Sequence, residues 1–270
     1  MIQLIADSVK YSCTIHKSNS DFPYLLMLHG FMGSADVFNP LLETLKSFCN
    51  PITIDLAGHG RTETPDTDGI LSAQNQIKQL QSLLERLSFS NLFIYGYSMG
   101  GRLAFQLISN SPGNFKGAII ESAHCGINEE NQRKKRRLLD AERADALENG
   151  FTDFIDEWVK MPLFANTPAK AAEIYESIMR AQVPALMARS LREFGAGVIP
   201  AVNKNLPLDL PVHLISGSFD TKYVQLQKEI ADQSVNFQHH IIGEAGHRVH
   251  TDKPLEVVRI IKDTVTSFSH

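Results

Sequence analysis

The stretch that decides the fold reads LFIYGYSMGGRLAFQLISN and spans residues 92–110. It opens with the continuous apolar run Leu92–Tyr97, typical of a strand buried on both faces, and closes with a segment of helical period over residues 103–110. The pattern G-x-S-x-G lies between them, with Ser98 at its centre. In a strand–turn–helix setting this pattern predicts a sharp turn that exposes the serine hydroxyl for chemistry; the alternative is a turn with only a structural role.

The buried-strand pattern recurs along the chain, and helical segments separate many of its copies. We expect such strands at residues 24–28, 51–56, 117–121, 212–216 and 237–242. The first 16 residues predict two short strands in a hairpin around residues 7–9. Residues 73–87 have the apolar period of a helix. Strands that alternate with helices predict a three-layer α/β fold around a mostly parallel sheet.

One long stretch breaks the alternation of strands and helices. Residues 126–206 contain no strand-like run, and their composition favours helices at residues 133–147, 154–158, 168–181 and 184–194. In the third of these helices, Thr167 is expected to be the capping residue and Pro168 the first helical residue. The stretch is far longer than an ordinary crossover of about a dozen residues. We therefore predict a helical cap at residues 126–206, inserted into a core of residues 1–125 and 207–270 and covering the sheet edge where ligands bind.

Composition restricts the class of protein. The chain has 270 residues, of which 43% are hydrophobic and 21% charged, with a formal net charge of −4. This length fits one large domain or two small ones, and the slightly acidic balance argues against a dedicated nucleic-acid binder. Cys13, Cys49 and Cys125 are too scattered for a disulfide framework or a zinc site. The sequence has no signal-peptide pattern and no apolar run of transmembrane length, so we expect a cytoplasmic protein without membrane insertion.

A serine hydroxyl needs a base, and the order of residues along the chain indicates one. In enzymes with this serine turn, the acid and then the histidine follow the serine. His247 comes just after the last predicted strand, and Asp220 follows the strand at residues 212–216, so both are expected at the same sheet edge as Ser98. Asp209 is the rival acid, but it precedes its strand and would lie at the wrong edge. We predict that Ser98, His247 and Asp220 form a catalytic triad.

An oxyanion that develops during the reaction requires backbone N–H donors. Met99, directly after the serine, is expected to supply one donor, and the loop after the strand at residues 24–28 the other. That loop reads HGFMG at residues 29–33, which makes the N–H of Phe31 the second predicted donor. The Phe31 side chain is expected either to form the floor of the pocket or to pack in the core.

Arginines near the predicted pocket indicate an anionic ligand. Arg102 lies four residues after Ser98, which places it on the same helix face, one turn further on. A buried guanidinium requires an anion, and the alternatives are an ion pair with a protein carboxylate and a clamp on a substrate carboxylate. In the predicted cap, residues 133–137 read RKKRR, and a solvated basic face is the usual explanation of such a run. Helical spacing puts three of these residues on one stripe, namely Arg133, Arg136 and Arg137.

Several motifs together resemble the α/β-hydrolase superfamily. They are GFMGS at residues 30–34, DLAGHG at 55–60, GYSMGGR at 96–102 and AGH at 245–247. The GYSMGGR form, the cap segment EWVKMPLF at residues 157–164 and the segment GSFDTK at residues 217–222 are similar to a family of pyruvate-eliminating synthases in menaquinone biosynthesis. The resemblance covers essentially the whole chain and implies an eight-stranded, mostly parallel sheet flanked by helices.

In that family the reaction is an elimination, in which a cyclohexene polycarboxylate loses pyruvate. The resemblance implies that Ser98, activated by His247 and Asp220, acts as the general base. It also implies substrate contacts from five side chains, namely Tyr97, Arg102, Arg136, Trp158 and Arg180. Trp158 is the only tryptophan, and packing in the core is the alternative role for it. The resemblance implies no cofactor and no metal; the expected partner is a small polycarboxylate, not nucleic acid, and the chain is expected to be a monomer or a weak dimer.

Two other classes of protein remain open at this stage. A carboxylesterase or a carbon–carbon bond hydrolase would use the same triad, with Ser98 as nucleophile through an acyl-enzyme. Arg102 argues against an ester pocket, because an apolar pocket has no use for a buried cation. A hydrolase-fold binding protein without activity would have no need of an intact triad, so the triad argues against that class.

Overall fold

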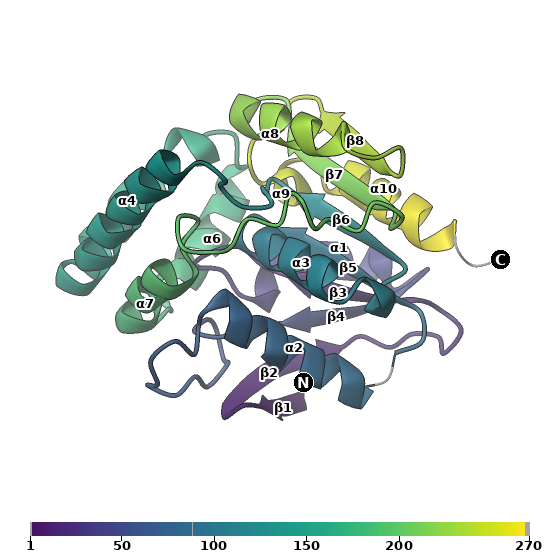
Figure 1. The fold of residues 1–270 in the computed structure, drawn as a ribbon, viewed down its shortest axis with the longest axis horizontal. Helices are drawn as coiled ribbons and strands as arrows, with labels where there is room; N and C mark the ends of the chain where they lie inside the picture. Colours follow the sequence, from purple (N-terminus) through teal and green to yellow (C-terminus); the bar gives the residue numbers. More distant parts are fainter. Residues whose placement is uncertain (1, 88, 268–270) are drawn as a thin grey trace.

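A single eight-stranded sheet forms the centre of the structure, a computed structural model that describes residues 2–87 and 89–267 (Figure 1). The strand order is β1-β2-β4-β3-β5-β6-β7-β8. The pairings β1–β2 and β2–β4 are antiparallel, and the other five are parallel. The strands are β1 (Ile2–Ala6), β2 (Val9–Ile15), β3 (Tyr24–Leu28), β4 (Asn50–Ile54), β5 (Leu92–Tyr97), β6 (Gly117–Glu121), β7 (Val212–Gly217) and β8 (Phe237–Ile242). The predicted mostly parallel α/β sheet, with a hairpin at its N-terminal edge, is therefore confirmed.

Helices cover both faces of the sheet, because its central strands are apolar on both sides. All residues of β4, β5 and β6 are buried. The helices α2 (Ala73–Leu87), α3 (Met99–Asn110) and α8 (Thr221–Ala231) contribute to the apolar core on one face, and α1 (Asn39–Leu45) and α10 (Pro254–Thr266) to the core on the other. Three short helical turns also lie outside the helical segment between β6 and β7, namely η1 (Ala35–Phe38), η2 (Pro112–Asn114) and α9 (Val249–Asp252). This three-layer packing fixes the carboxyl ends of the parallel strands, where the site lies.

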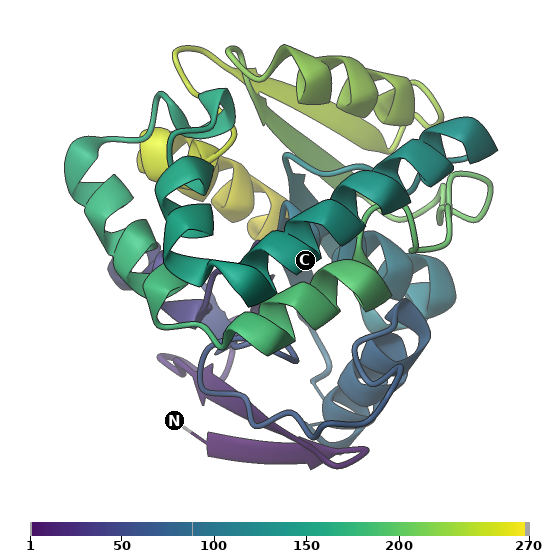
Figure 2. The ribbon, with the colours of Figure 1, turned by 90° about the vertical axis from the view of Figure 1, so that its left-hand side faces the viewer.

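A helical segment separates β6 from β7 and lies to one side of the sheet (Figure 1). It consists of α4 (Glu130–Asn149), α5 (Phe151–Trp158), η3 (Pro162–Phe164), α6 (Ala169–Arg180) and α7 (Pro184–Phe194). We call α4–α7 the helical insertion. Figure 2 shows α4 and α7 side by side across the outer side of the molecule. Buried apolar residues of the helical insertion, among them Leu147 and Met187, join the same core cluster as α1 and α10, whereas Phe194 of α7 joins the cluster on the other face.

The start of α6 differs from the sequence prediction by one residue. Pro168 is the capping residue and Ala169 the first helical residue, so the expectation of a Thr167 cap is wrong. Pro168 has an extended backbone, with ψ of 139°. Its carbonyl accepts hydrogen bonds from the N–H groups of Ala171 and Ala172, each at 2.9 Å. The extended ψ keeps Pro168 outside the helix, so that Pro168 and not Thr167 takes the capping position.

Candidate active site

Ser98 lies on the sharp turn between β5 and α3. Its backbone has φ of 52° and ψ of −108°, a conformation that costs a non-glycine residue on the order of 1–3 kcal/mol. The turn also needs glycine on either side of the serine. A Cβ on Gly100 would lie 2.2 Å from the Leu28 carbonyl oxygen, and one on Gly96 would lie 2.6 Å from the Gly100 carbonyl oxygen. The packing of α3 against β3 and β5 therefore holds the serine in a strained position at the sheet edge.

The structure brings Ser98, His247 and Asp220 within hydrogen-bond distance. His247 Nε2 lies 3.0 Å from Ser98 Oγ, and His247 Nδ1 lies 2.6 Å from Asp220 Oδ2. The histidine and the aspartate are both buried. An ionised carboxylate can only accept, so it fixes the proton on Nδ1 and leaves Nε2 free to accept the serine proton. Asp209, the rival acid, is exposed before β7 and takes no part in this arrangement.

The two predicted oxyanion donors are the backbone N–H groups of Met99, directly after the serine, and of Phe31, which lines the same cavity as Ser98. Met99 is the first residue of α3, where a backbone N–H has no acceptor within the helix. Phe31 lies in the loop after β3. The ring of His29 holds that loop, because its Nδ1 bonds the Gly30 carbonyl at 2.8 Å and its Nε2 accepts the Leu56 N–H at 3.0 Å. Each N–H of this kind can stabilise an oxyanion, and removing one donor costs about 10²–10³-fold in rate in known cases.

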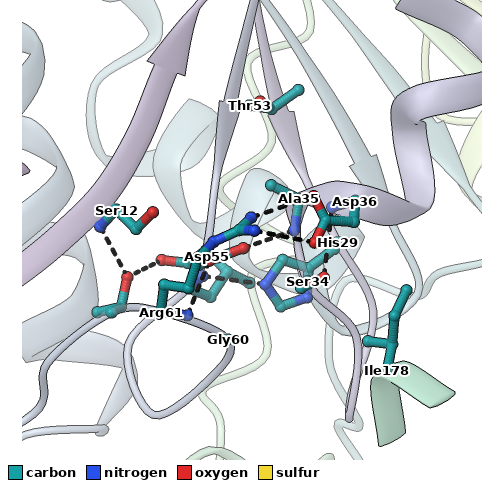
Figure 3. A network of polar contacts seen from close by, with 12 residues as sticks. Ser12, His29, Ser34, Ala35, Asp36, Thr53, Asp55, Gly60, Arg61 and Ile178 are labelled. Carbon is teal, nitrogen blue, oxygen red and sulfur yellow. Dashed lines mark hydrogen bonds and ion pairs between the residues drawn. The ribbon is translucent and has the colours of Figure 1, made fainter. Parts of the chain in front are cut away.

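A buried carboxylate, Asp55, forms the centre of a polar network next to the start of η1 (Figure 3). Asp55, directly after β4, is fully buried and accepts the N–H of Ala35 at 2.6 Å and the N–H of Arg61 at 2.9 Å. The Arg61 side chain bonds both Asp55, at 3.2 Å, and Asp36, at 3.1 Å. This network ties the start of η1 to the loop after β4, and sequence inspection alone gave no role for it.

Gln182, at the α6–α7 junction, links the helical insertion to the same two loops. Its amide nitrogen donates to the Gly33 carbonyl at 3.1 Å, and its amide oxygen accepts the Gly60 N–H at 3.0 Å. The side chain is buried. The position of the insertion is therefore coupled to the loop that carries the Phe31 donor.

A cavity of about 280 Å³ opens above the serine, between the sheet edge and the helical insertion. Its volume is near the lower end of small-molecule sites, about 300 Å³. The wall includes five cationic side chains, namely Arg102, Arg136, Arg143, Lys222 and Arg248. They come from α3, α4, α8 and the loop after β8, so separate parts of the sequence converge on one cationic cavity.

Arg102 has no ion pair in residues 2–87 and 89–267. Its Nη1 lies 3.5 Å from the Phe194 carbonyl oxygen, and its guanidinium lies 5.6 Å from the Phe194 ring. Burial, followed by the charge of Arg136, lowers the pKa of Arg102 to about 10. An unpaired charge in this position favours the ligand clamp over the protein ion pair, the two alternatives that the sequence left open.

The structure also distinguishes the arginines of α4. Arg136 lines the cavity and bonds Asp140 at 2.8 Å. Arg133 and Arg137 turn to backbone carbonyls of residues 198 and 197, away from the cavity lining. Arg143, which sequence inspection missed, joins Arg136 in the wall and lies 5.0 Å from the Trp158 ring. Its spacing of seven residues from Arg136, two helical turns, was the available signal.

Tyr97 and Trp158, both expected to contact substrate, line the cavity. The Trp158 ring makes an edge contact with Phe31 at 5.9 Å and stacks on Phe154 at 5.3 Å. Its indole Nε1 is buried and has no hydrogen-bond partner among the described residues. Tyr97 is buried, with its ring 5.6 Å from that of His247. Trp158 therefore packs against other aromatic residues and also forms part of the pocket wall.

Arg180 is the one predicted contact residue that the structure places elsewhere, and that prediction is corrected. It is exposed on α6 and forms ion pairs with Asp156 and Glu176. The same helix turns Tyr175 and Met179 toward the cavity. Arg180 follows Met179 by one residue, a rotation of about 100° on a helix, which carries its side chain to the surface.

Two further cations were missed in the sequence. Lys222 follows Asp220 by two residues at the start of α8, and burial together with the charge of Arg136 lowers its pKa. Arg248 follows His247 directly and is 4% exposed. Proximity to the triad residues in sequence was the only signal for either. The described residues contain no group of three or more His, Cys, Asp or Glu that could hold a metal ion.

A family model for the α/β hydrolase fold matches residues 23–254. The chain therefore belongs to the α/β-hydrolase family, as its sheet and its serine turn indicate. No helix in the described part of the chain is long and apolar enough to cross a membrane.

Particular relatives narrow this class. The chain is 28% identical over 238 residues to 2-succinyl-6-hydroxy-2,4-cyclohexadiene-1-carboxylate synthase of Salmonella typhimurium, covering 87% of this chain and 91% of the relative. A Bacillus subtilis protein that carries the same name provisionally is 29% identical over 268 residues, covering 97% of both chains. Among solved structures, MenH from S. aureus superimposes with a TM-score of 0.88 at 27% identity, covering 95% of this chain and 98% of that one.

Proposed function

We propose that this protein is a lyase that forms 2-succinyl-6-hydroxy-2,4-cyclohexadiene-1-carboxylate and pyruvate from 2-succinyl-5-enolpyruvyl-6-hydroxy-3-cyclohexene-1-carboxylate. The unpaired Arg102 in the same cavity as the Ser98–His247–Asp220 array carries the proposal. The relatives of that name support it through their similarity over most of the chain. A small carboxylate substrate explains why a chain of net charge −4 gathers five cations around one cavity.

The reaction begins with removal of the ring proton on carbon 2, which the adjacent succinyl ketone acidifies. Ser98 Oγ takes this proton as its own proton passes to His247 Nε2. The electron pair forms the C2–C3 double bond, the C3–C4 double bond moves to C4–C5, and the C5–O bond breaks. The departing enolpyruvate keeps that pair and takes up a proton at its methylene carbon, which yields pyruvate. No covalent bond to the serine forms.

The backbone donors and the buried acid act on the charges that develop. The N–H groups of Phe31 and Met99 stabilise the negative charge on the succinyl carbonyl oxygen. Asp220 stabilises the imidazolium of His247 after the proton transfer. Arg102 and Arg136 hold substrate carboxylates, with Tyr97 and Trp158 as the aromatic wall. We further propose that residues 126–206 act as a cap on a core of residues 1–125 and 207–270; a cytoplasmic location remains a prediction.

The experiment is a pyruvate-release assay on the enolpyruvyl substrate without added metal or cofactor, comparing the wild-type protein with Ser98→Ala. We expect the wild-type protein to release one pyruvate per substrate and the variant to release almost none. Rapid turnover of simple aryl esters with no release of pyruvate would overturn the proposal in favour of an esterase with Ser98 as nucleophile.

A further inference from the structure

Arg248 is a buried cation inside the cavity that the proposed reaction leaves unused. It lies between His247 and the short helix α9 and is 4% exposed. Its guanidinium carbon lies 3.9 Å from the centre of the Phe164 ring and 3.8 Å from the centre of the Tyr175 ring. The core thus supplies the arginine, while η3 and α6 of the helical insertion supply the aromatic rings that hold it.

Arg248 forms no ion pair within residues 2–87 and 89–267, although its charge opposes the burial that raises the pKa of Asp252 on α9. Its buried Nε has no hydrogen-bond partner there. Arg248 interacts with the Tyr97 phenol in the cavity wall: burial raises the pKa of that phenol, and the Arg248 charge opposes the rise. The attraction of aromatic faces for a desolvated cation is smaller than the cost of removing that cation from water. An unpaired, buried guanidinium on a cavity wall calls for an anionic ligand.

Arg248 is separate from the other cations of the cavity. Arg102 and Arg136 are cationic neighbours of Tyr223, whose ring lies 4.9 Å from that of His247. Arg248 instead contacts Phe164, whose ring lies 6.4 Å from that of His247. The two sets of cations approach the catalytic histidine through different neighbours, so they suit different groups of one substrate.

The substrate of the proposed function has a matching distribution of charge. Its ring carboxylate and its succinyl group sit on adjacent carbons, 1 and 2, whereas the enolpyruvyl group sits on carbon 5, across the ring from carbon 2. Two carboxylates therefore lie toward one side and the third toward the other. The group of four cations suits the pair of carboxylates, and that group comprises Arg102, Arg136, Arg143 and Lys222.

We propose that Arg248 binds the carboxylate of the enolpyruvyl group that leaves as pyruvate, an inference that rests on the proposed function. The guanidinium offers two parallel N–H donors, which match the two oxygens of a carboxylate. The family resemblance implied Arg180 as a third substrate-binding arginine beside Arg102 and Arg136. Arg248 fills that role instead, and it comes from the core, next to the catalytic histidine. The chemical class of ligand at Arg248 is thus a short 2-oxo or 2-enol carboxylate.

Trp158 gives a direct readout of binding at this site. It is the only tryptophan of the chain and lines the cavity, so its fluorescence reports on ligands there. Pyruvate and succinate are titrated separately into the wild-type protein, Arg248→Gln, Arg102→Gln and Arg259→Gln. Arg259 is an exposed arginine of α10 and serves as the matched control. Circular dichroism confirms that each variant is folded.

The proposal expects selective losses. Arg248→Gln should weaken pyruvate binding about tenfold or more and leave succinate binding near the wild-type value, because a charged hydrogen bond is lost at one site only. Arg102→Gln should weaken succinate binding and spare pyruvate, and Arg259→Gln should change neither. Arg248→Lys should recover part of the affinity for pyruvate, because it keeps the charge without the planar fork.

Three results would overturn the proposal: wild-type protein that does not bind pyruvate, unchanged pyruvate affinity in Arg248→Gln, or equal loss of both ligands in both cavity variants. The pyruvate-release assay is evaluated separately. If the wild-type protein binds pyruvate through Arg248 but releases none from the enolpyruvyl substrate, the proposed function fails and the carboxylate site stands. If turnover occurs but Arg248→Gln leaves pyruvate binding unchanged, the proposed function stands and the Arg248 inference fails.

Discussion

The core and the helical insertion contribute different things to the cavity. The core supplies backbone geometry: Ser98 at φ of 52° and His247 held 2.6 Å from Asp220. The insertion supplies long side chains, such as Arg143 and Trp158, on helix faces. Backbone geometry fixes which protons move, whereas side chains on a helix face decide which ligand fits. Substitutions in the triad should therefore abolish turnover, and those of charged side chains in the cavity wall should change substrate affinity.

The largest expected effect is in the core. Asp220→Asn should lower kcat by about 10³–10⁴-fold, because the amide no longer fixes the proton on His247 Nδ1 or stabilises the imidazolium. The measurement is steady-state pyruvate release, with thermal unfolding as a check on folding. If Asp220→Asn kept more than half of the wild-type kcat, the core would not hold the catalytic acid.

The next largest effect is expected at Arg102, where a substitution should lower activity but raise the stability of the ligand-free protein. Arg102→Met should lower kcat/KM by about 2–5 kcal/mol in free-energy terms, the scale for removing one partner of a desolvated charge pair. The ligand-free variant should unfold at a higher temperature than the wild-type protein, because an unpaired buried charge is replaced by an apolar chain of similar length. Calorimetry without ligand checks the second part. Unchanged kinetics together with a lower unfolding temperature would show that Arg102 is only structural.

The same arginine predicts a pH dependence. The lowered pKa of Arg102, about 10, means that its charge is present below pH 10 and is lost as the pH rises through that value. Substrate affinity should therefore fall on the alkaline side near pH 10. Lys222, whose pKa is also lowered, contributes to the same limb. KM is measured against pH for the wild-type protein, Arg102→Met and Lys222→Met, and a limb unchanged in both variants would contradict the assignment.

A smaller effect is expected where the insertion contacts a catalytic loop. Gln182→Ala removes the bridge between Gly33 and Gly60 and should lower kcat about tenfold with little change in KM, because a loosened Phe31 donor weakens the oxyanion stabilisation only in part. Gln182→Glu keeps the acceptor for Gly60 but loses the donor to Gly33, so its kcat should fall between those of the wild-type protein and Gln182→Ala. An effect on KM alone would place Gln182 with the ligand-binding side chains.

The smallest expected effect belongs to Arg180. Its ion pairs with Asp156 and Glu176 are on the surface, and such pairs contribute about 0–1 kcal/mol. Because Arg180 lies outside the cavity wall, Arg180→Gln should leave kcat/KM within about twofold of the wild-type value. A large rise in KM would move Arg180 into the site and would make the insertion, not the core, the source of the third arginine.

The contrast between Arg180 and Arg248 shows what the sequence can predict. The serine turn, the acid and the histidine each follow a recognisable strand, so chain order alone predicts their common sheet edge. The sequence pattern predicts that the segments of α4 and α6 are helical. Which face of each helix meets the cavity depends instead on how the helices pack. Arg180 and Met179 differ by one residue and lie on different faces. Arg248 carried no periodic signal, because it lies in a loop.

The most direct measurement is single-turnover mixing of the wild-type protein with the enolpyruvyl substrate, followed by parallel assays of pyruvate and of intact protein mass. The proposed lyase predicts one pyruvate per substrate consumed, a protein mass that stays at 30.1 kDa throughout, and almost no reaction in Ser98→Ala. Consumption of substrate without pyruvate, or a transient gain in mass that Ser98→Ala abolishes, would contradict it and identify Ser98 as a nucleophile.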